Sequence, residues 1–380
     1  MIYFDNAATT FPKPREVSAA VIHHMQAHGG NPGRGAHPLA LAAAEAVYDA
    51  RSEIAAFFGG TKPENVVFTQ NATHALNLAI FGTVRAGDHV LISNLEHNSV
   101  FRPVAELCRR GAVSYSIFDA LGTDEETLSG IKKLLRRNTR VLICTHASNV
   151  CPKVLPLARI SRLCRERGIL HIADVSQSAG IYRVDMREGA DIVCAPGHKG
   201  LYGPQGTGFC LFADRFDFSA LSPTVFGGNG VNSATPEMGR TPPESFEAGT
   251  LPAPAIAGLC RGVRFVKRLG TEKIHAHERA ISEKIRSFLL QNERVKVYLP
   301  YENAGSTLLL NADGLSAASL AERLTKRGVC TRAGMHCSPL AHKALGTGGE
   351  ALRLSFSAFN TAKEAEDFCG IFSEILKEKG

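Results

Sequence analysis

The sequence lacks the features that mark nucleic-acid-binding and membrane proteins. It contains no tryptophan, and its 7 tyrosines and 20 phenylalanines show little repeated alternation with basic residues. The formal net charge of +7 is spread along the chain without a basic block, a mild excess that suits anionic small molecules. No apolar run reaches membrane-spanning length, and residues 1–5 do not begin a secretory signal peptide. We expect a cytoplasmic protein that binds neither nucleic acid nor membrane.

Paired cysteines are also missing. None of the 10 cysteines forms a Cys-x-x-Cys pair, which argues against a zinc site, and we expect no metal. Cysteines without a signal peptide indicate reduced thiols, and Cys144, Cys194 and Cys210 lie in apolar runs that should fill the core. With 380 residues, 44% hydrophobic and 21% charged, the chain is long enough for two domains.

Lys199 follows a short apolar run, residues 192–195, which predicts a buried strand. Glycines and prolines come after it, so the lysine should lie on a sharp turn at the strand end. Partial desolvation there favours the neutral amine, the form that attacks a carbonyl and forms a Schiff base. A solvated glycine-rich loop is the commoner use of such a stretch.

A second apolar run, residues 169–173, ends in Asp174 and is followed by Gln177. Neighbouring parallel strands deliver their C-terminal residues to one edge of a sheet, where α/β proteins bind ligands. Pyridoxal phosphate needs a lysine for its aldehyde and a carboxylate for its ring nitrogen, so Lys199 and Asp174 together predict that cofactor. The alternative for Asp174 is a helix cap after a strand.

Three further polar stretches follow predicted strands. Residues 65–69 form a strand, and Ala72 and Thr73 lie where the next helix begins, so their N–H groups can bind phosphate or simply cap the helix. His97 follows the strand at 89–93 and can lie flat on a cofactor ring, although a lone histidine is more often a surface group. Asn149 follows the strand at 140–144.

The remaining pattern gives the domain organisation. Helices are predicted at 15–28 and 38–58, with His23, His24 and His28 on an exposed helix face. Alternating strands and helices over 65–210 predict a mainly parallel sheet covered on both faces, an α/β fold. Residues 226–254 are a long loop rich in Gly, Pro, Ser and Thr. Beyond it, helices at 255–269, 272–292, 317–328 and 362–379 and strands at 306–311 and 351–356 predict a smaller α+β domain. We therefore expect an N-terminal arm (1–14) packed on the small domain, a large domain (15–254) and a small C-terminal domain (255–380).

Cys337 has surroundings that differ from those of the other cysteines. It lies on a short loop between His336 and Ser338 with Arg332 nearby, a setting that lowers a thiol pKa, although a structural thiol is the default. Arg332 and Arg353 are candidates for binding the carboxylate of an amino acid, with a surface salt bridge as the alternative.

Taken together, these stretches resemble the cysteine desulfurases of the class V aminotransferase family, which are fold type I pyridoxal-phosphate enzymes. The matching segments are residues 3–10, 31–37, 96–97, 148–150, 173–177, 197–199, 202–204, 246–250, 332–337 and 353–361. The short loop around Cys337 is similar to the group with a compact cysteine loop. The resemblance implies a large domain with a mainly parallel seven-stranded sheet and a smaller α+β domain.

The resemblance also implies a role for each candidate residue. Lys199 would carry pyridoxal phosphate covalently, and Cys337 would accept sulfur from L-cysteine as a persulfide, leaving L-alanine. His97 would stack on the ring, with Asp174 at the pyridine nitrogen, Gln177 at the ring hydroxyl and Asn149 beside the ring. Thr73 and His198 would hold the phosphate, and Thr250 would reach the phosphate of the partner in a homodimer. Arg353 would bind the substrate carboxylate.

Two positions depart from the family pattern. Pro196 stands where these enzymes usually have serine, so one phosphate hydroxyl is missing, and Met335 replaces the first of two histidines before the cysteine. Selenocysteine lyase, or another pyridoxal-phosphate reaction on the same scaffold, is the alternative activity. A sulfur carrier or scaffold protein without activity is a further alternative, and the sulfur acceptor is left open.

Overall fold

The computed structural model describes residues 1–380 except 34, 232–233, 300, 303 and 379–380. Arg34 of the matching segment 31–37, residues 232–233 of the predicted loop and the predicted helix end at residue 379 therefore lie outside the described residues. No helix in the described part of the chain is long and apolar enough to cross a membrane.

The centre of the molecule is a seven-stranded sheet, as the resemblance implied. Its order is β2 (Val66–Thr69), β8 (Gly208–Phe212), β7 (Ile192–Pro196), β6 (Leu170–Asp174), β5 (Thr139–Thr145), β3 (His89–Ser93) and β4 (Ser114–Phe118). The strands from β7 to β4 pair in parallel, and only β8 runs antiparallel to its neighbours β7 and β2. The carboxyl ends of β3, β5, β6 and β7 therefore lie at one edge.

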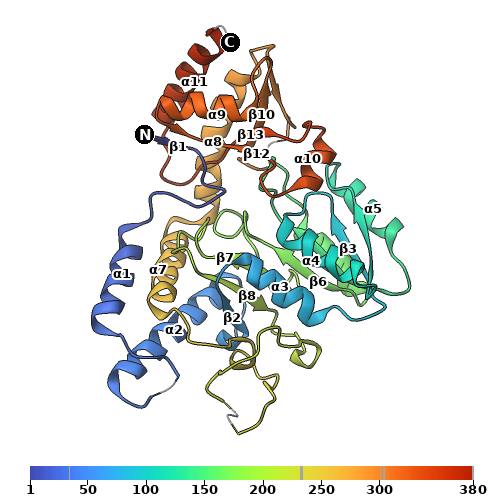
Figure 1. Cartoon of the computed structure of the whole chain (residues 1–380), viewed down its shortest axis with the longest axis vertical. Coiled ribbons are helices and arrows are strands. Elements are labelled where there is room, and N and C mark those ends of the chain that lie inside the picture. The colour runs from blue at the N-terminus through green and yellow to red at the C-terminus, as the bar shows by residue number, and fades with distance from the viewer. Residues whose placement is uncertain (34, 232–233, 300, 303, 379–380) are drawn as a thin grey trace.

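Helices cover both faces of this sheet, and successive strand residues alternate between two cores. Leu142 and Cys144 of β5 pack with residues of α2 (Pro38–Phe57), α6 (Leu157–Glu166) and α7 (Ala253–Leu269). Val141 and Ile143 pack on the other side with α3 (Ala72–Thr83) and α4 (Asn98–Arg109). α5 (Asp124–Leu134) follows β4, and α1 (Arg15–Ala27) packs along α7 (Figure 1). The predicted α/β class is confirmed.

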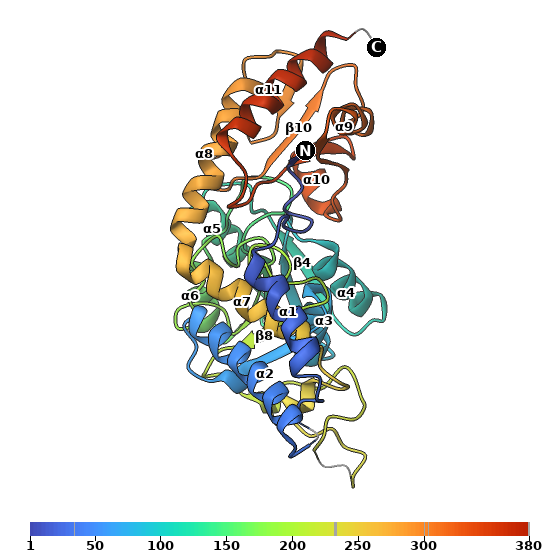
Figure 2. The same ribbon diagram turned by 90° about the vertical axis from the view of Figure 1, so that its left-hand side faces the viewer.

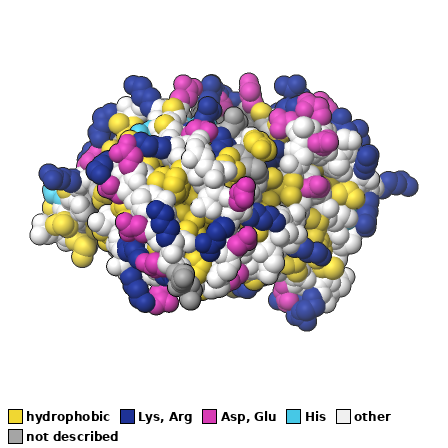
Figure 3. Space-filling model, turned by 90° about the horizontal axis from the view of Figure 1, so that it is seen from above, with side chains coloured by type: hydrophobic (Ala, Val, Ile, Leu, Met, Phe, Trp, Pro, Cys, Tyr) yellow, Lys and Arg dark blue, Asp and Glu magenta, His cyan; other side chains and the backbone are white. Residues whose placement is uncertain are grey.

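The C-terminal part forms a second layer with its own core (Figure 2). A four-stranded antiparallel sheet has the order β12 (Arg332–Gly334), β13 (Ala351–Leu354), β10 (Leu308–Ala312) and β9 (Val295–Val297). Its helices are α8 (Thr271–Leu289), α9 (Ala317–Lys326), α10 (Pro339–Leu345) and α11 (Ala362–Lys377). Acidic and basic side chains are interspersed over this end of the molecule (Figure 3).

The N-terminal arm crosses from the C-terminal part to the large sheet. β1 (Ile2–Tyr3) pairs with β11 (Val329–Cys330), and Asp5 bridges to Ser355. Further along the arm, the carbonyl of His198 accepts hydrogen bonds from Thr9, Thr10 and Lys13. The arm therefore connects the loop that carries Lys199 to the C-terminal part. The domain boundary between residues 254 and 255 stays a prediction.

Residues 213–252 contain only short helical turns among the described residues, at Phe218–Ala220 and Glu244–Phe246, in accord with the loop predicted at 226–254. The exposed helix face predicted for His23, His24 and His28 is wrong for His24, which is 2% exposed. The cause is tertiary, because α7 packs along this side of α1. Cys144, Cys194 and Cys210 are buried, as predicted.

Candidate active site

Several strand ends of the central sheet surround one cavity of about 100 Å³. β7 ends in Pro196 and leads to His198 and Lys199, while β6 ends in Asp174. The predicted residues that line the cavity are Ala72, Thr73, His97, Asn149, Asp174, Gln177, His198 and Lys199. Asn71, Ser99, Thr145, Ser176 and Pro196 complete the lining. The folded chain thus brings together eight of the nine residues that were expected around a cofactor, and the ninth, Thr250, does not line the cavity.

The amine of Lys199 has the properties that a Schiff base requires. Its burial lowers the pKa from 10.5 to about 8, while the nearby carboxylate of Asp174 opposes that shift and the guanidinium groups of Arg353 and Arg332 add to it. At neutral pH, far more of this lysine is a neutral amine than an exposed lysine would be.

Asp174 is 3% exposed and lines the same cavity. Its Oδ1 accepts a hydrogen bond from the N–H of Ser176 at 2.9 Å. A second carboxyl, Glu96, is fully buried close by, and its burial raises its pKa to about 8. Glu96 Oε1 accepts from the N–H of Thr145 at 2.9 Å and from the hydroxyl of Ser93. Glu96 is therefore mostly protonated at neutral pH, so it adds little negative charge beside Asp174.

His97 caps the start of α4, and this cap fixes its ring. Its Nδ1 accepts the N–H of Ser99 at 3.0 Å, and burial lowers its pKa to about 4, so the ring is neutral with its proton on Nε2. A neutral imidazole beside the cavity can lie against an aromatic ring without adding charge.

The other end of the cavity fits a phosphate. The side chain of Asn71 caps α3 by accepting the N–H of His74 at 2.9 Å, and Ala72 and Thr73 in the first turn line the cavity. First-turn N–H groups have no partner within a helix and attract anions. His198 Nδ1 is buried and has no hydrogen-bond partner among the described residues. A bound anion would satisfy these donors, so the residues fit the phosphate of the expected cofactor.

Cys337 lies on a firmly held loop beside the cavity. Cys337 is exposed to solvent. The backbone φ angles of His336 and Cys337 are both positive, at 51° and 57°. Asn149 Nδ2 donates to the His336 carbonyl at 2.8 Å, and Ser338 Oγ donates to Asn149 Oδ1 at 2.8 Å. The N–H of Asn98 donates to the Cys337 carbonyl at 2.7 Å. These bonds hold a backbone conformation that non-glycine residues seldom adopt.

The thiol opens onto a hollow of about 380 Å³ that it shares with Thr73, His97 and Ser99. The same three residues line the cavity that contains Lys199 and Asp174. Cys337 itself does not line that inner cavity, so the thiol lies in a neighbouring hollow that shares these three residues with it.

A series of hydrogen-bonded, buried side chains continues from the cysteine loop. The sequence did not predict these contacts. His336 Nε2 lies 3.1 Å from the Arg332 carbonyl and must donate to it, so His336 Nδ1 accepts from His342 Nε2 at 3.1 Å. His342 Nδ1 then accepts from the hydroxyl of Thr347 at 2.7 Å. Both histidines are neutral, because burial lowers the pKa of His336 to about 3 and also lowers that of His342.

The two candidate arginines have different settings. Arg353 is 1% exposed, and its guanidinium donates to Asp5 Oδ1 at 2.6 Å and to the Asn149 carbonyl at 3.0 Å. Its Nε is buried without a partner among the described residues. Arg332 is exposed on β12. Neither arginine lines the inner cavity, and the pairing of Asp5 with Arg353 was not predicted from the sequence.

Thr250 is the predicted cofactor residue that lies apart from the others. It is exposed, and its hydroxyl accepts from Asn31 Nδ2 at 3.5 Å, at the end of the molecule formed by the loop after residue 226. Within one chain it does not reach the cavity.

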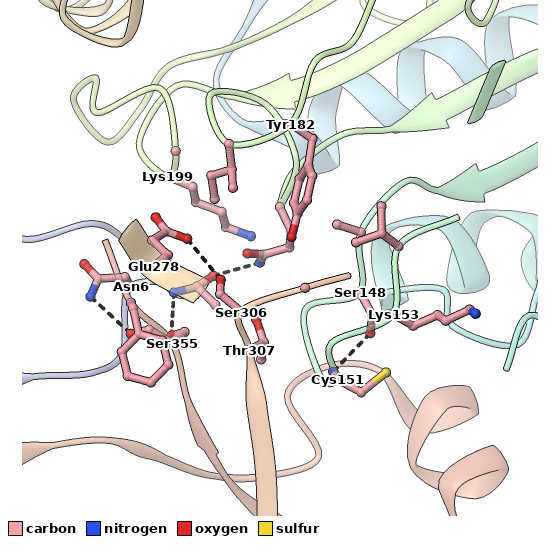
Figure 4. A pocket seen from close by; sticks show the side chains of 18 of the residues that line it. Asn6, Ser148, Cys151, Lys153, Tyr182, Lys199, Glu278, Ser306, Thr307 and Ser355 are labelled. Atoms are coloured by element: carbon pink, nitrogen blue, oxygen red, sulfur yellow. Dashed lines mark hydrogen bonds between the residues drawn. The ribbon is translucent and has the colours of Figure 1, made fainter. Parts of the chain in front are cut away.

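A smaller hollow of about 30 Å³ also reaches Lys199, where the N-terminal arm meets the C-terminal part. Figure 4 shows Lys199 above Ser306, whose hydroxyl donates to Glu278 at 3.0 Å, with Tyr182 and Asn6 nearby. Burial raises the pKa of Glu278 to about 8. The lysine therefore lies between two parts of the fold.

Comparison with known proteins decides between families. The family model described as Aminotransferase class-V matches residues 2–368. The chain belongs to this family. Class-V aminotransferases use pyridoxal phosphate, which confirms the resemblance and the cofactor drawn from the sequence. Among the described residues, no group of three or more His, Cys, Asp or Glu side chains is placed to hold a metal ion.

Several proteins named as cysteine desulfurases or probable cysteine desulfurases are similar over nearly the whole chain. A probable cysteine desulfurase of Methanothermobacter thermautotrophicus is 32% identical, covering 99% of this chain and 94% of the relative. A probable cysteine desulfurase of Halobacterium salinarum is 31% identical, with 96% and 89% covered. The apo structure of a cysteine desulfurase from Thermococcus onnurineus NA1 has a TM-score of 0.91 and 29% identity, with 99% and 94% covered.

Proposed function

We propose that this protein is a cysteine desulfurase that converts L-cysteine to L-alanine and takes the sulfur onto Cys337 as a persulfide. The observation that carries the proposal is the exposed thiol of Cys337, which shares one hollow with His97 and Thr73 at the mouth of the lysine cavity. The relatives named cysteine desulfurase support the same reaction.

The cavity residues would hold pyridoxal phosphate by both of its ends. Lys199 would bind its aldehyde carbon, Asp174 its ring nitrogen and Gln177 its ring hydroxyl, while His97 and Asn149 flank the ring. The first turn of α3, with Thr73 and His198, would hold the phosphate. When bound, the cofactor withdraws electrons from Cα of an amino acid.

Lys199 and Asp174 would then divide the proton chemistry. Asp174 is 3% exposed and would stabilise a positive charge next to its oxygens, because little water screens that interaction. Lys199 has a pKa of about 8, so its free amine can take a proton from Cα and give it back at neutral pH. Arg353 would fix the substrate carboxylate through the nitrogens that Asp5 and Asn149 leave free.

Cys337 would perform the sulfur transfer. Its thiolate attacks the sulfur of the substrate, a new S–S bond forms and the Cβ–S bond breaks. The electron pair of the broken bond stays with Cβ, which takes up a proton to become the methyl group of alanine. The exposed position of Cys337 then leaves the persulfide open to a reducing thiol or an acceptor protein.

Thr250 would complete the site of a second copy in a homodimer. Large apolar side chains are exposed on α1, α2 and the loop after residue 224, the same end of the molecule as Thr250; they are Ile22, Met25, Leu39, Leu41, Tyr48, Val225 and Phe226. An apolar surface of this kind is typical of a protein interface. Asn31 would orient the Thr250 hydroxyl toward the partner's phosphate. The free state of all ten cysteines supports a cytoplasmic location.

The test is alanine and sulfide formation from L-cysteine with a reducing thiol as acceptor. We expect Cys337→Ser to keep the yellow colour of the cofactor and to lose activity at least about 100-fold, because among the described residues no other cysteine lines either hollow. Cys108→Ser is the matched control, since Cys108 is a partly exposed cysteine on α4 outside both hollows. L-Selenocysteine in the same assay separates the alternative: retained alanine formation by Cys337→Ser from selenocysteine alone would indicate a selenocysteine lyase.

A further inference from the structure

The N-terminal arm contacts three of the predicted site residues from outside the cofactor cavity. Asp5 Oδ1 accepts a hydrogen bond from the guanidinium of Arg353 at 2.6 Å, and the carbonyl of Ala7 accepts from Gln177 Nε2 at 3.0 Å. The following residues of the arm contact the loop that carries Lys199. One short segment therefore holds a residue of the C-terminal part together with residues that follow two strands of the central sheet.

Lys13 makes the shortest of the contacts with the lysine loop. Its amine donates to the carbonyl of His198 and to Thr10 Oγ1, each at 2.6 Å. The Thr10 hydroxyl has a single proton, which can go to the Lys199 carbonyl at 3.0 Å or to the His198 carbonyl at 3.2 Å. Because the His198 carbonyl already accepts from Lys13, the proton of Thr10 goes to the Lys199 carbonyl. Lys13 thus holds one carbonyl directly and the next one through Thr10.

The amine of Lys13 has no other partner in the described part of the chain, where no carboxylate pairs with it. The side chain is half-buried, and its burial lowers its pKa from 10.5 to about 8. An amine that gives up water without gaining a counter-charge is costly unless hydrogen bonds compensate for the loss. The hydrogen bonds that compensate here all support the lysine loop.

The turn after Lys199 depends on such support. Tyr202 is buried and has a φ of 55°, a backbone conformation that non-glycine residues seldom adopt. Its N–H donates to the Lys199 carbonyl at 2.8 Å, and the N–H of Gly203 donates to the Gly197 carbonyl at 2.7 Å. A strained turn persists only where its surroundings fix it, and the Lys199 carbonyl is where the turn and the arm meet.

We propose that Lys13 is a positioning residue for Lys199, which fixes the carbonyl groups on either side of that residue and so sets where its amine enters the cavity. Lys13 does not line the cavity, so it acts through the backbone of residues 198 and 199. The inference rests on the role of Lys199 under the proposed function.

The first test is hydrogen exchange of the full-length apoprotein, measured by mass spectrometry of its peptides. We expect Lys13→Met to speed exchange over residues 197–203 about tenfold and to leave strand β5 unchanged, because only the loop loses its support. Arg15→Met is the matched control, since it removes an exposed cation at the start of α1. Unchanged exchange over 197–203, or an equal rise in β5 as expected from a general loss of stability, would overturn the proposal.

The second test is the rate at which Lys199 captures pyridoxal phosphate at about pH 9. Both amines have a pKa of about 8 and are mostly neutral there, so the loss of charge at Lys13 matters little, while its neutral amine still has two N–H groups for its two oxygens. Lys13→Met should lower the rate about tenfold, because a displaced amine meets the aldehyde less often in a reactive geometry. Lys13→Arg keeps the donors and should stay within about threefold of the wild type. Equal rates for Lys13→Met and the wild type would overturn the proposal.

Thr10 provides a third test. Lys13→Met combined with Thr10→Val should be slower than the slower single variant by less than about twofold, because both residues hold the same carbonyl groups; losses that multiply would contradict this. If Lys13→Met does not fold, Thr10→Val should speed exchange over 197–203 and Thr10→Ser should not, and equal exchange in the two would overturn the proposal. Failure of the wild-type apoprotein to bind pyridoxal phosphate would instead refute the proposed function.

Discussion

The lowered pKa of Lys199 predicts how the apoprotein captures pyridoxal phosphate as the pH changes. A lysine with a pKa of 10.5 is neutral in about one molecule in 3,000 at pH 7, whereas a pKa of about 8 makes about one in ten neutral. Only the neutral amine attacks the aldehyde, so the fold makes the reactive form about 300 times more abundant. The capture rate should rise about tenfold per pH unit below pH 8 and level off above it.

The same reasoning predicts the effect of the neighbouring charge. Asp174 opposes the shift of the Lys199 pKa, so Asp174→Asn should move the midpoint of the rate profile to a lower pH. The assay is stopped-flow absorbance of the covalent adduct, followed by borohydride reduction and peptide mapping. Lys199→Ala, which has no amine at this position, is the control.

Lys13 makes the mapping a sharp test. Burial also lowers its pKa to about 8, but its amine donates to Thr10 Oγ1 and to the His198 carbonyl, each at 2.6 Å, and it does not line the cavity. The label should therefore appear on Lys199 and not on Lys13. A flat rate between pH 6 and pH 9, a midpoint near that of an ordinary lysine, or a label on Lys13 would refute the account of the site.

Three further predictions concern residues around the cavity. Asp5→Asn leaves the buried guanidinium of Arg353 without its partner and should lower the free energy of unfolding by about 3 kcal/mol, measured with denaturant; an unchanged value would show that the pair does not stabilise the fold. His342→Ala removes the hydrogen-bond partner of His336 and should lower kcat about tenfold without changing the cofactor absorbance, because the thiol of Cys337 loses its position. An equal loss of bound cofactor would contradict this prediction. Burial raises the pKa of Glu278 to about 8 in the folded state, whereas its pKa is near 4.5 in the unfolded chain. Between these pH values the unfolded chain loses the proton and the folded chain keeps it. The free energy of unfolding of the wild type should therefore fall, relative to that of Glu278→Gln, by up to about 1.4 kcal/mol per pH unit as the pH rises. Melting curves of both proteins at several pH values check the last prediction, and parallel curves would show that Glu278 is not buried with its proton.

The residues that could be predicted from the sequence are those placed by strand ends. A short apolar run precedes each of Lys199, Asp174 and His97. Parallel strands bring the residues at their carboxyl ends to one edge of the sheet, regardless of the conformation of the connecting loops. For this reason the fold class and most of the cavity lining followed from local pattern and from the family resemblance. The role of Thr250 rests on the resemblance alone and stays a prediction, since within one chain Thr250 does not line the cavity.

The contacts that could not be predicted from the sequence depend on how distant elements pack against each other. Asp5 meets Arg353 because the N-terminal arm pairs with β11, a contact across most of the chain. His342 meets His336 through one turn of α10, and Ser99 meets Thr73 because α3 and α4 pack side by side. A serine or histidine in an ordinary helix start carries no local signal of such a partner. The wrong exposure expected for His24 has the same origin.

The most direct test of the proposed chemistry is to locate the sulfur after one turnover. The holoenzyme is mixed with one equivalent of L-cysteine, free thiols are blocked, and the peptides that contain its ten cysteines are mapped by mass spectrometry. We predict one alanine released per sulfur bound, with the extra sulfur on Cys337. Sulfur on a different cysteine, or alanine formed with no sulfur on the protein, would contradict the assignment of Cys337 as the acceptor.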